Sequence, residues 1–180
     1  AKCLGAHVVA VCSKRNAELV RKLGADEVVD YTAGDVLAAL HRVVGRDGGQ
    51  GFHLVLDCVS SHDERDQAAL DYEVAVRRAQ PPLLEADATY ITIGGRTHEW
   101  AVAGLERTVG VNLFPLVSKG KELFWVRFPH ATRALDTLAA WADEGKLRPL
   151  VSREVPLSDE GVQSAFAELH SRRAVGKCVV

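Results

Sequence analysis

The chain has 180 residues, of which 47% are hydrophobic and 26% are charged, and its formal net charge is −2. These values are typical of a globular α/β protein, and this length is sufficient to bury one sizeable core. Acidic and basic residues are interspersed, which argues against a nucleic-acid-binding protein, and no apolar run approaches the roughly 18 residues that cross a bilayer.

The first five residues, Ala1 to Gly5, resemble the last turn of a helix that a glycine closes. A dinucleotide-binding half normally begins earlier, with a strand and a Gly-x-Gly-x-x-Gly turn, and neither is present. The chain also contains no methionine. We therefore expect it to be an internal-to-C-terminal piece of a longer protein.

A strand, a basic tip, a helix and a second strand follow, which is the pattern of a βαβ unit. In such a unit the tip selects the cofactor, because an acid there binds the 2′-hydroxyl of NAD, whereas cations and hydroxyls bind the 2′-phosphate of NADP. The tip comprises Ser13, Lys14, Arg15 and Asn16, and the next acid in sequence is Glu18. This pattern favours NADP. The alternative is that Lys14 and Arg15 are only the solvated start of a helix.

Apolar runs alternate with helical patterns along the rest of the chain, which predicts a doubly wound parallel sheet. The predicted strands are His7–Cys12, Glu27–Asp30, His53–Asp57, Thr89–Ile93, Glu122–Phe128, Leu150–Val155 and Gly176–Val180. The predicted helices are Arg15–Leu23, Asp35–Val44, Glu64–Ala79, Ala131–Glu144 and one that Ser158 caps. The stretch Arg96–Lys121 has few periodic signals, so we expect a long, partly ordered excursion there.

Six short segments follow one another in a specific order: Val-Val-Ala-Val-Cys-Ser (8–13), Leu-Gly-Ala-Asp-Glu-Val-Val-Asp-Tyr (23–31), Leu-Val-Leu-Asp-Cys-Val (54–59), Tyr-Ile-Thr-Ile-Gly-Gly (90–95), Gly-Lys-Leu-Arg-Pro (145–149) and Gly-Lys-Cys-Val-Val (176–180). Together they resemble the nucleotide-binding half of the medium-chain dehydrogenase/reductase superfamily. Within it, the chain is most similar to the zinc-free quinone oxidoreductase branch, which includes zeta-crystallin-like and reticulon-interacting mitochondrial enzymes.

The resemblance implies a Rossmann-like, doubly wound parallel sheet that lacks its first strand and Gly-rich loop. Residues 1–147 would form an incomplete NADP-binding domain, and residues 148–180 would pack on a missing N-terminal catalytic domain. The complete enzyme would transfer hydride from NADPH to a small-molecule substrate, a quinone or an α,β-unsaturated carbonyl, and a homodimer is possible. We expect this chain alone to be inactive and name no catalytic residue.

The resemblance also implies a set of cofactor-binding residues. The phosphate end would be held by Ser13, Lys14, Arg15, Asn16 and Tyr31, although some relatives carry Lys where this chain has Asn16. The adenine, ribose and nicotinamide would be lined by Cys58, Val59, Gly94, Gly95, Val126 and Phe128. A C-terminal basic pair, Arg172 and Lys177, would fold back over the cofactor. An ordinary strand end at Tyr31 and a simple turn at Gly94-Gly95 are the alternatives.

The seven histidines show no metal-ligand spacing, so we assign no metal. Four scattered cysteines favour a reducing compartment, the cytoplasm or the mitochondrial matrix, and Cys12 and Cys58 stand at strand ends where buried thiols are common. Two other functions remain open. One is a zinc-dependent alcohol dehydrogenase or enoyl-thioester reductase, and the other is a non-catalytic nucleotide-sensing or interaction protein.

Overall fold

A computed structural model describes all residues of the chain except 47, 61–71, 110–119, 125–130 and 172. The chain divides into two compact units, Ala1–Val126 and Arg127–Val180. Each unit is described separately below.

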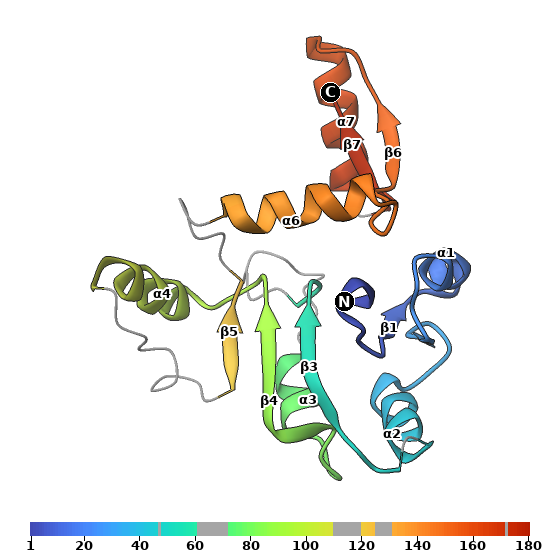
Figure 1. Ribbon diagram of the computed structural model, residues 1–180, viewed down its shortest axis with the longest axis vertical. Helices are drawn as coiled ribbons and strands as arrows, with labels where there is room; N and C mark the ends of the chain where they lie inside the picture. The colour runs from blue at the N-terminus through green and yellow to red at the C-terminus, as the bar shows by residue number, and fades with distance from the viewer. Residues whose placement is uncertain (47, 61–71, 110–119, 125–130, 172) are drawn as a thin grey trace. The chain divides into compact units, whose positions relative to one another are not determined.

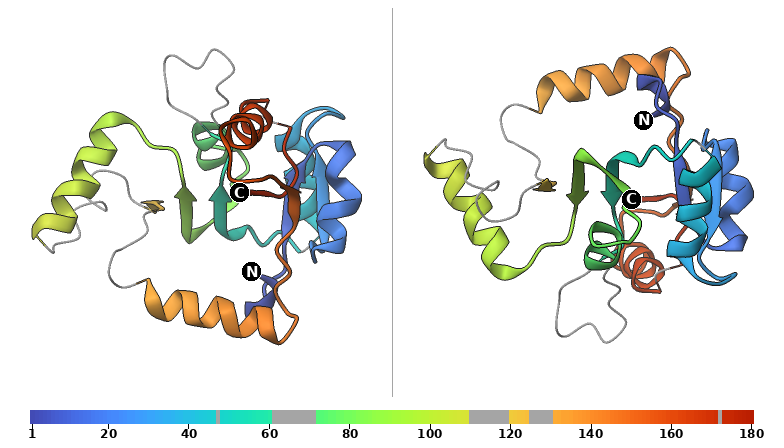
Figure 2. Two further views of the ribbon diagram at one scale, coloured as in Figure 1. Left: turned by 90° about the horizontal axis from the view of Figure 1, so that it is seen from above. Right: turned by 90° about the horizontal axis from the view of Figure 1, so that it is seen from below.

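The first unit opens with a parallel pair of strands, β1 (Val9–Cys12) and β2 (Glu27–Asp30), in which Cys12 lies opposite Asp30. A short 3₁₀ turn, η1 (Lys2–Leu4), precedes β1 and ends at Gly5, whose φ of 79° is left-handed as a C-terminal helix cap requires. Between the strands lie a second 3₁₀ turn, η2 (Lys14–Asn16), and helix α1 (Ala17–Lys22). In Figure 2, α1 lies beside this pair of strands in both views.

A second, three-stranded sheet has the order β3-β4-β5, and all of its strands are parallel. Its members are β3 (Phe52–Asp57), β4 (Leu84–Thr92) and β5 (Lys121–Leu123), and Figure 1 shows them side by side. The connections contain helix α3 (Glu73–Arg77) after β3 and helix α4 (Thr97–Val109) after β4. Because the strands are parallel, the segments that follow β3 and β4 begin at the same edge of the sheet.

Helix α2 (Val36–Arg46) carries the main hydrophobic core of this unit. Its start is capped by Asp35, whose carboxylate accepts hydrogen bonds from the backbone N–H groups of Leu37 (2.8 Å) and Ala38 (3.2 Å), as the sequence predicts. The core contains residues from α2, from β2 and from the segment before β4: Val29, Leu40, Val43, Val44, Ala79 and Leu83. Phe52 of β3 packs against this core, so the helix shares one apolar core with both sheets.

The second unit contains α6 (Thr132–Asp143), β6 (Val151–Glu154), α7 (Asp159–His170) and β7 (Lys177–Val179). Strands β6 and β7 are parallel. Ser158 caps α7 by accepting a hydrogen bond from the Gly161 N–H at 3.1 Å. A Cβ on Gly161 would lie only 2.1 Å from the Pro156 carbonyl oxygen, so this turn accepts no side chain.

The predicted fold class is confirmed, since the structure is a mixed α/β fold with parallel strands. Over the ranges that the structure describes, the strands form three separate sheets, and no ladder of hydrogen bonds joins β1 to β3. Most predicted elements are found within two residues of their bounds. Strand β4 is longer than predicted because it begins at Leu84, and β5 is limited to Lys121–Leu123 among described residues.

The stretch expected to be a partly ordered excursion contains regular structure that the sequence does not predict, because Thr97–Val109 form helix α4. The start of this helix is held by the carboxylate of Glu99, which accepts a hydrogen bond from the Arg96 N–H at 2.7 Å. The predicted helix Glu64–Ala79 is described only in part, and that part contains the short helix α3.

Candidate functional site

The predicted cofactor residues of the first unit lie at the carboxyl ends of its strands. Ser13 follows β1, Tyr31 follows β2, Cys58 follows β3, and Gly94 lies two residues after β4. Ligands of open parallel α/β sheets bind outside these ends. The candidate site therefore comprises two carboxyl edges, that of the β1–β2 pair at Ser13 and Tyr31 and that of the β3–β4–β5 sheet at Cys58 and Gly94.

The basic tip is an exposed 3₁₀ turn. Ser13 stands at its start in an extended conformation, and the Asn16 N–H donates a hydrogen bond to the Ser13 carbonyl oxygen at 2.9 Å. The side chains of Lys14 and Arg15 are exposed. Tyr31 is brought next to this turn because its N–H donates to the Cys12 carbonyl oxygen at 3.1 Å, and the residue is 48% exposed. The fold thus places Tyr31 beside the tip.

A carboxylate that the sequence analysis did not consider lies under the tip. Asp30 ends β2, and its Oδ1 accepts hydrogen bonds from the Thr32 hydroxyl (2.6 Å) and the Thr32 N–H (2.8 Å). These bonds lower the pKa of Asp30, to which the Lys14 N–H and the Lys14 charge also contribute. The tip has no acid of its own, but the Asp30 carboxylate from the neighbouring strand binds the backbone of Lys14. Asp30 reaches the tip because it pairs with Cys12, the last residue of β1.

A buried hydrogen-bond network fixes the turn after β3. The Asp57 carboxylate accepts bonds from the backbone N–H groups of Val59 and Ser60, both at 2.9 Å, and from the hydroxyl of Tyr90, which is 1% exposed. The Ser60 hydroxyl in turn accepts a bond from the Tyr72 N–H at 2.9 Å. This network ties β3 to β4 at the candidate site.

The charge states of this network follow from its geometry. Burial acts to raise the pKa of Asp57, but the hydrogen bonds from Ser60, Tyr90 and Val59 outweigh it and lower the pKa. Burial and the nearby Asp57 carboxylate raise the pKa of Tyr90. Asp57 is therefore an ionised acceptor and Tyr90 a neutral donor.

The turn after β4 is tightly packed. The Thr92 hydroxyl donates to the Gly94 carbonyl oxygen at 2.8 Å and accepts from the Gly94 N–H at 3.1 Å. A Cβ on Gly95 would lie 2.6 Å from Leu123 Cδ2 and 3.2 Å from Trp100 Nε1. A side chain at position 95 would therefore require Leu123 to move, and close approach of a cofactor there stays a prediction.

A buried ionic cluster behind this edge was not predicted. The Lys121 ammonium, whose side chain is 1% exposed, lies 2.6 Å from Glu73 Oε2 and 2.6 Å from Glu99 Oε1. Arg77 contacts the other oxygen of Glu73 at 2.8 Å. Burial acts to raise the pKa of Glu73 and Glu99, but their hydrogen bonds, first of all those from Lys121, lower it. Both carboxylates are thus ionised.

This cluster predicts how stability depends on pH. Because the folded-state pKa values of Glu73 and Glu99 lie below their ordinary value of 4.5, these groups stabilise the fold above that pH. The stabilisation is lost as the pH falls through the lowered values, so we expect the melting temperature to drop between about pH 5 and pH 3. Thermal unfolding followed by circular dichroism measures this change.

The matched variants are Glu99→Gln in the cluster and Glu18→Gln on the exposed surface, where Glu18 pairs only with Lys22 among described residues. We expect E99Q to be less stable at neutral pH and less sensitive to acid, and E18Q to follow the wild-type profile. An unchanged profile for E99Q would contradict this assignment.

The remaining predicted residues are placed as follows. Lys177 begins β7 in the second unit, and Val126, Phe128 and Arg172 lie outside the described residues. The expectation of a buried thiol is wrong for Cys58, which is exposed because it stands in the turn after β3. Partial burial and the Asp57 carboxylate raise the pKa of this thiol. Val59 is also exposed.

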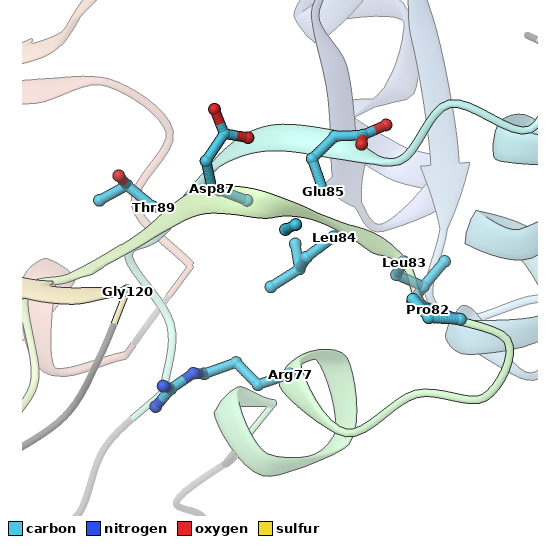
Figure 3. A pocket seen from close by; sticks show the side chains of 10 residues that line it. Arg77, Pro82, Leu83, Leu84, Glu85, Asp87, Thr89 and Gly120 are labelled. Carbon is cyan, nitrogen blue, oxygen red and sulfur yellow. The ribbon is translucent and has the colours of Figure 1, made fainter.

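One cavity lies away from the carboxyl ends of the strands. It has a volume of about 440 Å³ and lies between α3 and the first half of β4. Figure 3 shows Arg77 on one side of β4, with the carboxylates of Glu85 and Asp87 pointing to the other side. Since it lies toward the amino ends of the strands, we do not assign it to the cofactor.

Within the described ranges, no three His, Cys, Asp or Glu side chains come together in a way that would hold a metal ion. Among the described helices, none has the length and apolar character needed to span a bilayer.

Comparison with known families gives one match, to a family model described as zinc-binding dehydrogenase, over residues 23–180. The mitochondrial NAD(P)H oxidoreductase RTN4IP1 of Mus musculus is 36% identical over 99% of this chain and 42% of its own length. The trans-enoyl reductase pgmF of Aspergillus terreus is 32% identical over the whole chain and 46% of its own length. The chain therefore spans less than half the length of these relatives.

Solved structures show the same fold. A quinone oxidoreductase from Coxiella burnetii matches 99% of this chain and 45% of its own, with a TM-score of 0.66 and 21% identity. An NAD-dependent alcohol dehydrogenase matches with a TM-score of 0.65 and 22% identity, over 99% of this chain and 44% of its own. At these identities the likeness establishes the fold and not the reaction.

Proposed function

The chain belongs to the zinc-binding dehydrogenase family, in the quinone oxidoreductase-like branch of the medium-chain dehydrogenase/reductase superfamily, and on this premise we propose that it forms the NADPH-binding part of an oxidoreductase. The complete protein would transfer hydride to a quinone or an α,β-unsaturated carbonyl. Relatives named as an NAD(P)H oxidoreductase and a trans-enoyl reductase support this choice of acceptor.

The observation that carries the proposal is the basic tip. Ser13, Lys14 and Arg15 present one hydroxyl and two cations after the first strand, with Tyr31 beside them. The carboxylate of Asp30 is engaged by Thr32 and by the backbone of Lys14. The groups exposed at the tip are therefore those that bind a 2′-phosphate.

Each group then has a distinct role. Lys14 and Arg15 bind the phosphate, Ser13 and Asn16 donate hydrogen bonds to it, and Tyr31 packs beside the adenosine. The turns that carry Cys58, Val59, Gly94 and Gly95 line the rest of the cofactor, and the bonds to Asp57 hold the first of these turns in place. When bound, the reduced nicotinamide supplies the hydride. Val126, Phe128, Arg172 and Lys177 complete the proposed set.

The family description names zinc. Cysteines and histidines are the usual zinc ligands, and because no such group gathers among the described residues, we name no zinc ligand in this part of the chain. We propose zinc-free chemistry on the resemblance to the zinc-free quinone oxidoreductase branch alone.

The wider setting is also part of the proposal. We propose a second functional segment at residues 148–180 that packs on a catalytic domain, a possible homodimer, and a location in the mitochondrial matrix or the cytoplasm. The mitochondrial relatives support the first of these locations.

The experiment that tests the cofactor introduces the double variant Lys14→Ala/Arg15→Ala into the complete protein. We expect it to weaken NADPH binding by about 2–4 kcal/mol, since two charge-assisted bonds to the 2′-phosphate are lost, and to leave NADH binding nearly unchanged. Isothermal titration of both cofactors measures the difference. Lys22→Ala is the matched control, because Lys22 is an exposed cation of the adjoining helix α1 that pairs with Glu18. Equal affinity of the unmodified protein for NADPH and NADH would refute the assignment.

A further inference from the structure

A second, polar cavity lies beside the buried ionic cluster. It has a volume of about 280 Å³, and its charged lining comes from α3 and from the start of α4: Glu73, Arg77, Arg78, Arg96, His98 and Glu99. Arg96 directly follows the Gly94-Gly95 turn. The lining contains no residue of the basic tip, Ser13 to Asn16, so the cavity is separate from that tip.

Both carboxylates in this lining are already engaged. Glu73 binds Lys121 through one oxygen (2.6 Å) and Arg77 through the other (2.8 Å). Glu99 binds Lys121 through Oε1 (2.6 Å) and the Arg96 N–H through Oε2 (2.7 Å). The two negative charges are thus balanced by Lys121 and Arg77.

The other two arginines are not balanced. Arg78 and Arg96 are exposed at the cavity, and no side chain that the structure describes forms an ion pair with either of them. Adding their charges to the neutral set of Glu73, Glu99, Lys121 and Arg77 leaves an excess of two positive charges. His98 adds a further nitrogen donor to the same lining.

The buried cluster prevents its own glutamates from neutralising the two extra positive charges. Since Lys121 occupies one oxygen of each glutamate, neither carboxylate is free to turn and neutralise Arg78 or Arg96. The low pKa values of both glutamates keep this pairing intact at neutral pH. The guanidinium groups therefore remain available for an external anion, and their forked donors match an oxyanion.

We propose that this cavity binds the oxyanion group of a small molecule, a carboxylate or a phosphate, between Arg78 and Arg96. The site is distinct from the proposed cofactor tip, and its binding does not depend on redox activity. Both groups share the chemistry that a pair of guanidinium groups recognises, and the test separates them.

The test titrates the protein with sodium phosphate and, separately, with sodium succinate, at constant ionic strength set with sodium chloride. The variant is Arg78→Gln/Arg96→Gln, and the control is Lys22→Gln, which removes an exposed cation of α1 outside both proposed sites. We expect at least one of the two anions to bind the wild type and the control equally, and the double glutamine variant to bind it about tenfold or more weakly. Calorimetry measures these affinities.

Both arginines are exposed, so we expect the variant to melt at the wild-type temperature, which shows that its fold is intact. Tighter binding of phosphate or of succinate by the wild type identifies the group, and either result supports the proposal. No binding of either anion beyond the chloride control, or equal affinities in the wild type and the double glutamine variant, overturns it. The cofactor preference of the double glutamine variant separates the two proposals. If this variant still binds NADPH more tightly than NADH, a failure of the anion site leaves the proposed cofactor function intact.

Discussion

Replacing Lys121 with methionine is expected to lower the free energy of unfolding by about 3–5 kcal/mol, because two buried carboxylates lose the cation they share. The side chains of Glu73 and Glu99 are only 10% and 7% exposed, so water cannot replace the ammonium. Methionine retains the length of the aliphatic stem and removes the charge. Chemical denaturation followed by fluorescence or circular dichroism measures the loss.

Lys22→Met is the matched control, since Lys22 pairs with Glu18 on the exposed face of α1. An exposed pair of this kind contributes about 0.5 kcal/mol or less, so we expect the control to unfold like the wild type. Adding Glu99→Gln to the Lys121 variant removes one of the stranded charges and is expected to recover part of the stability. A Lys121 variant as stable as the control would show that the cluster does not stabilise the fold.

The second large effect is expected at Asp57, where alanine leaves three buried or half-buried donors without their acceptor. These are the N–H groups of Val59 and Ser60 and the hydroxyl of Tyr90. At roughly 1–3 kcal/mol for each unsatisfied group, three groups give about 3–9 kcal/mol, and we expect the low end of about 3–4 kcal/mol in the free energy of unfolding because Val59 is exposed. Denaturant titration measures it, and Asp87→Ala, at an exposed position of β4, is the control.

Two further variants separate the contribution of the Asp57 carboxylate to stability from that of its hydrogen-bond donors. Tyr90→Phe removes the hydroxyl itself, so no buried donor is left without an acceptor. We therefore expect the free energy of unfolding to fall by only about 1–2 kcal/mol. Asp57→Asn keeps the size of the side chain and weakens the acceptor, and we expect an intermediate loss. If Asp57→Ala were no worse than Asp87→Ala, the network would have no role in holding the turn after β3.

Much of the fold could be predicted because its elements have local signals. The strand Glu27–Asp30 has the predicted bounds, and Asp35 and Ser158 cap helices as their side chains suggest. Helix α4 could not be predicted in the same way. Its first turn depends on Glu99, and Glu99 is held by Lys121, which is 22 positions further along the chain.

The candidate site likewise has one part that local sequence predicts and another that depends on distant contacts. The composition of the tip is readable from four consecutive residues, but the carboxylate beneath it comes from the next strand and depends on the register between β1 and β2. In the sequence, Asp57 stands out only as part of the family motif Leu-Val-Leu-Asp-Cys-Val. Its role depends on Tyr90, 33 residues away, which no local pattern connects with it.

Helix α2 has a consequence for how the first unit unfolds. No backbone ladder connects the β1–β2 pair with the β3–β4–β5 sheet in the described part of the chain, whereas Val43 and Leu40 share one core with Val29 and Leu83. Opening either sheet exposes the same apolar surface to water, so the two sheets form one cooperative unit through a helix. A cavity introduced at Val43 therefore weakens both sheets at once, although the residue belongs to neither.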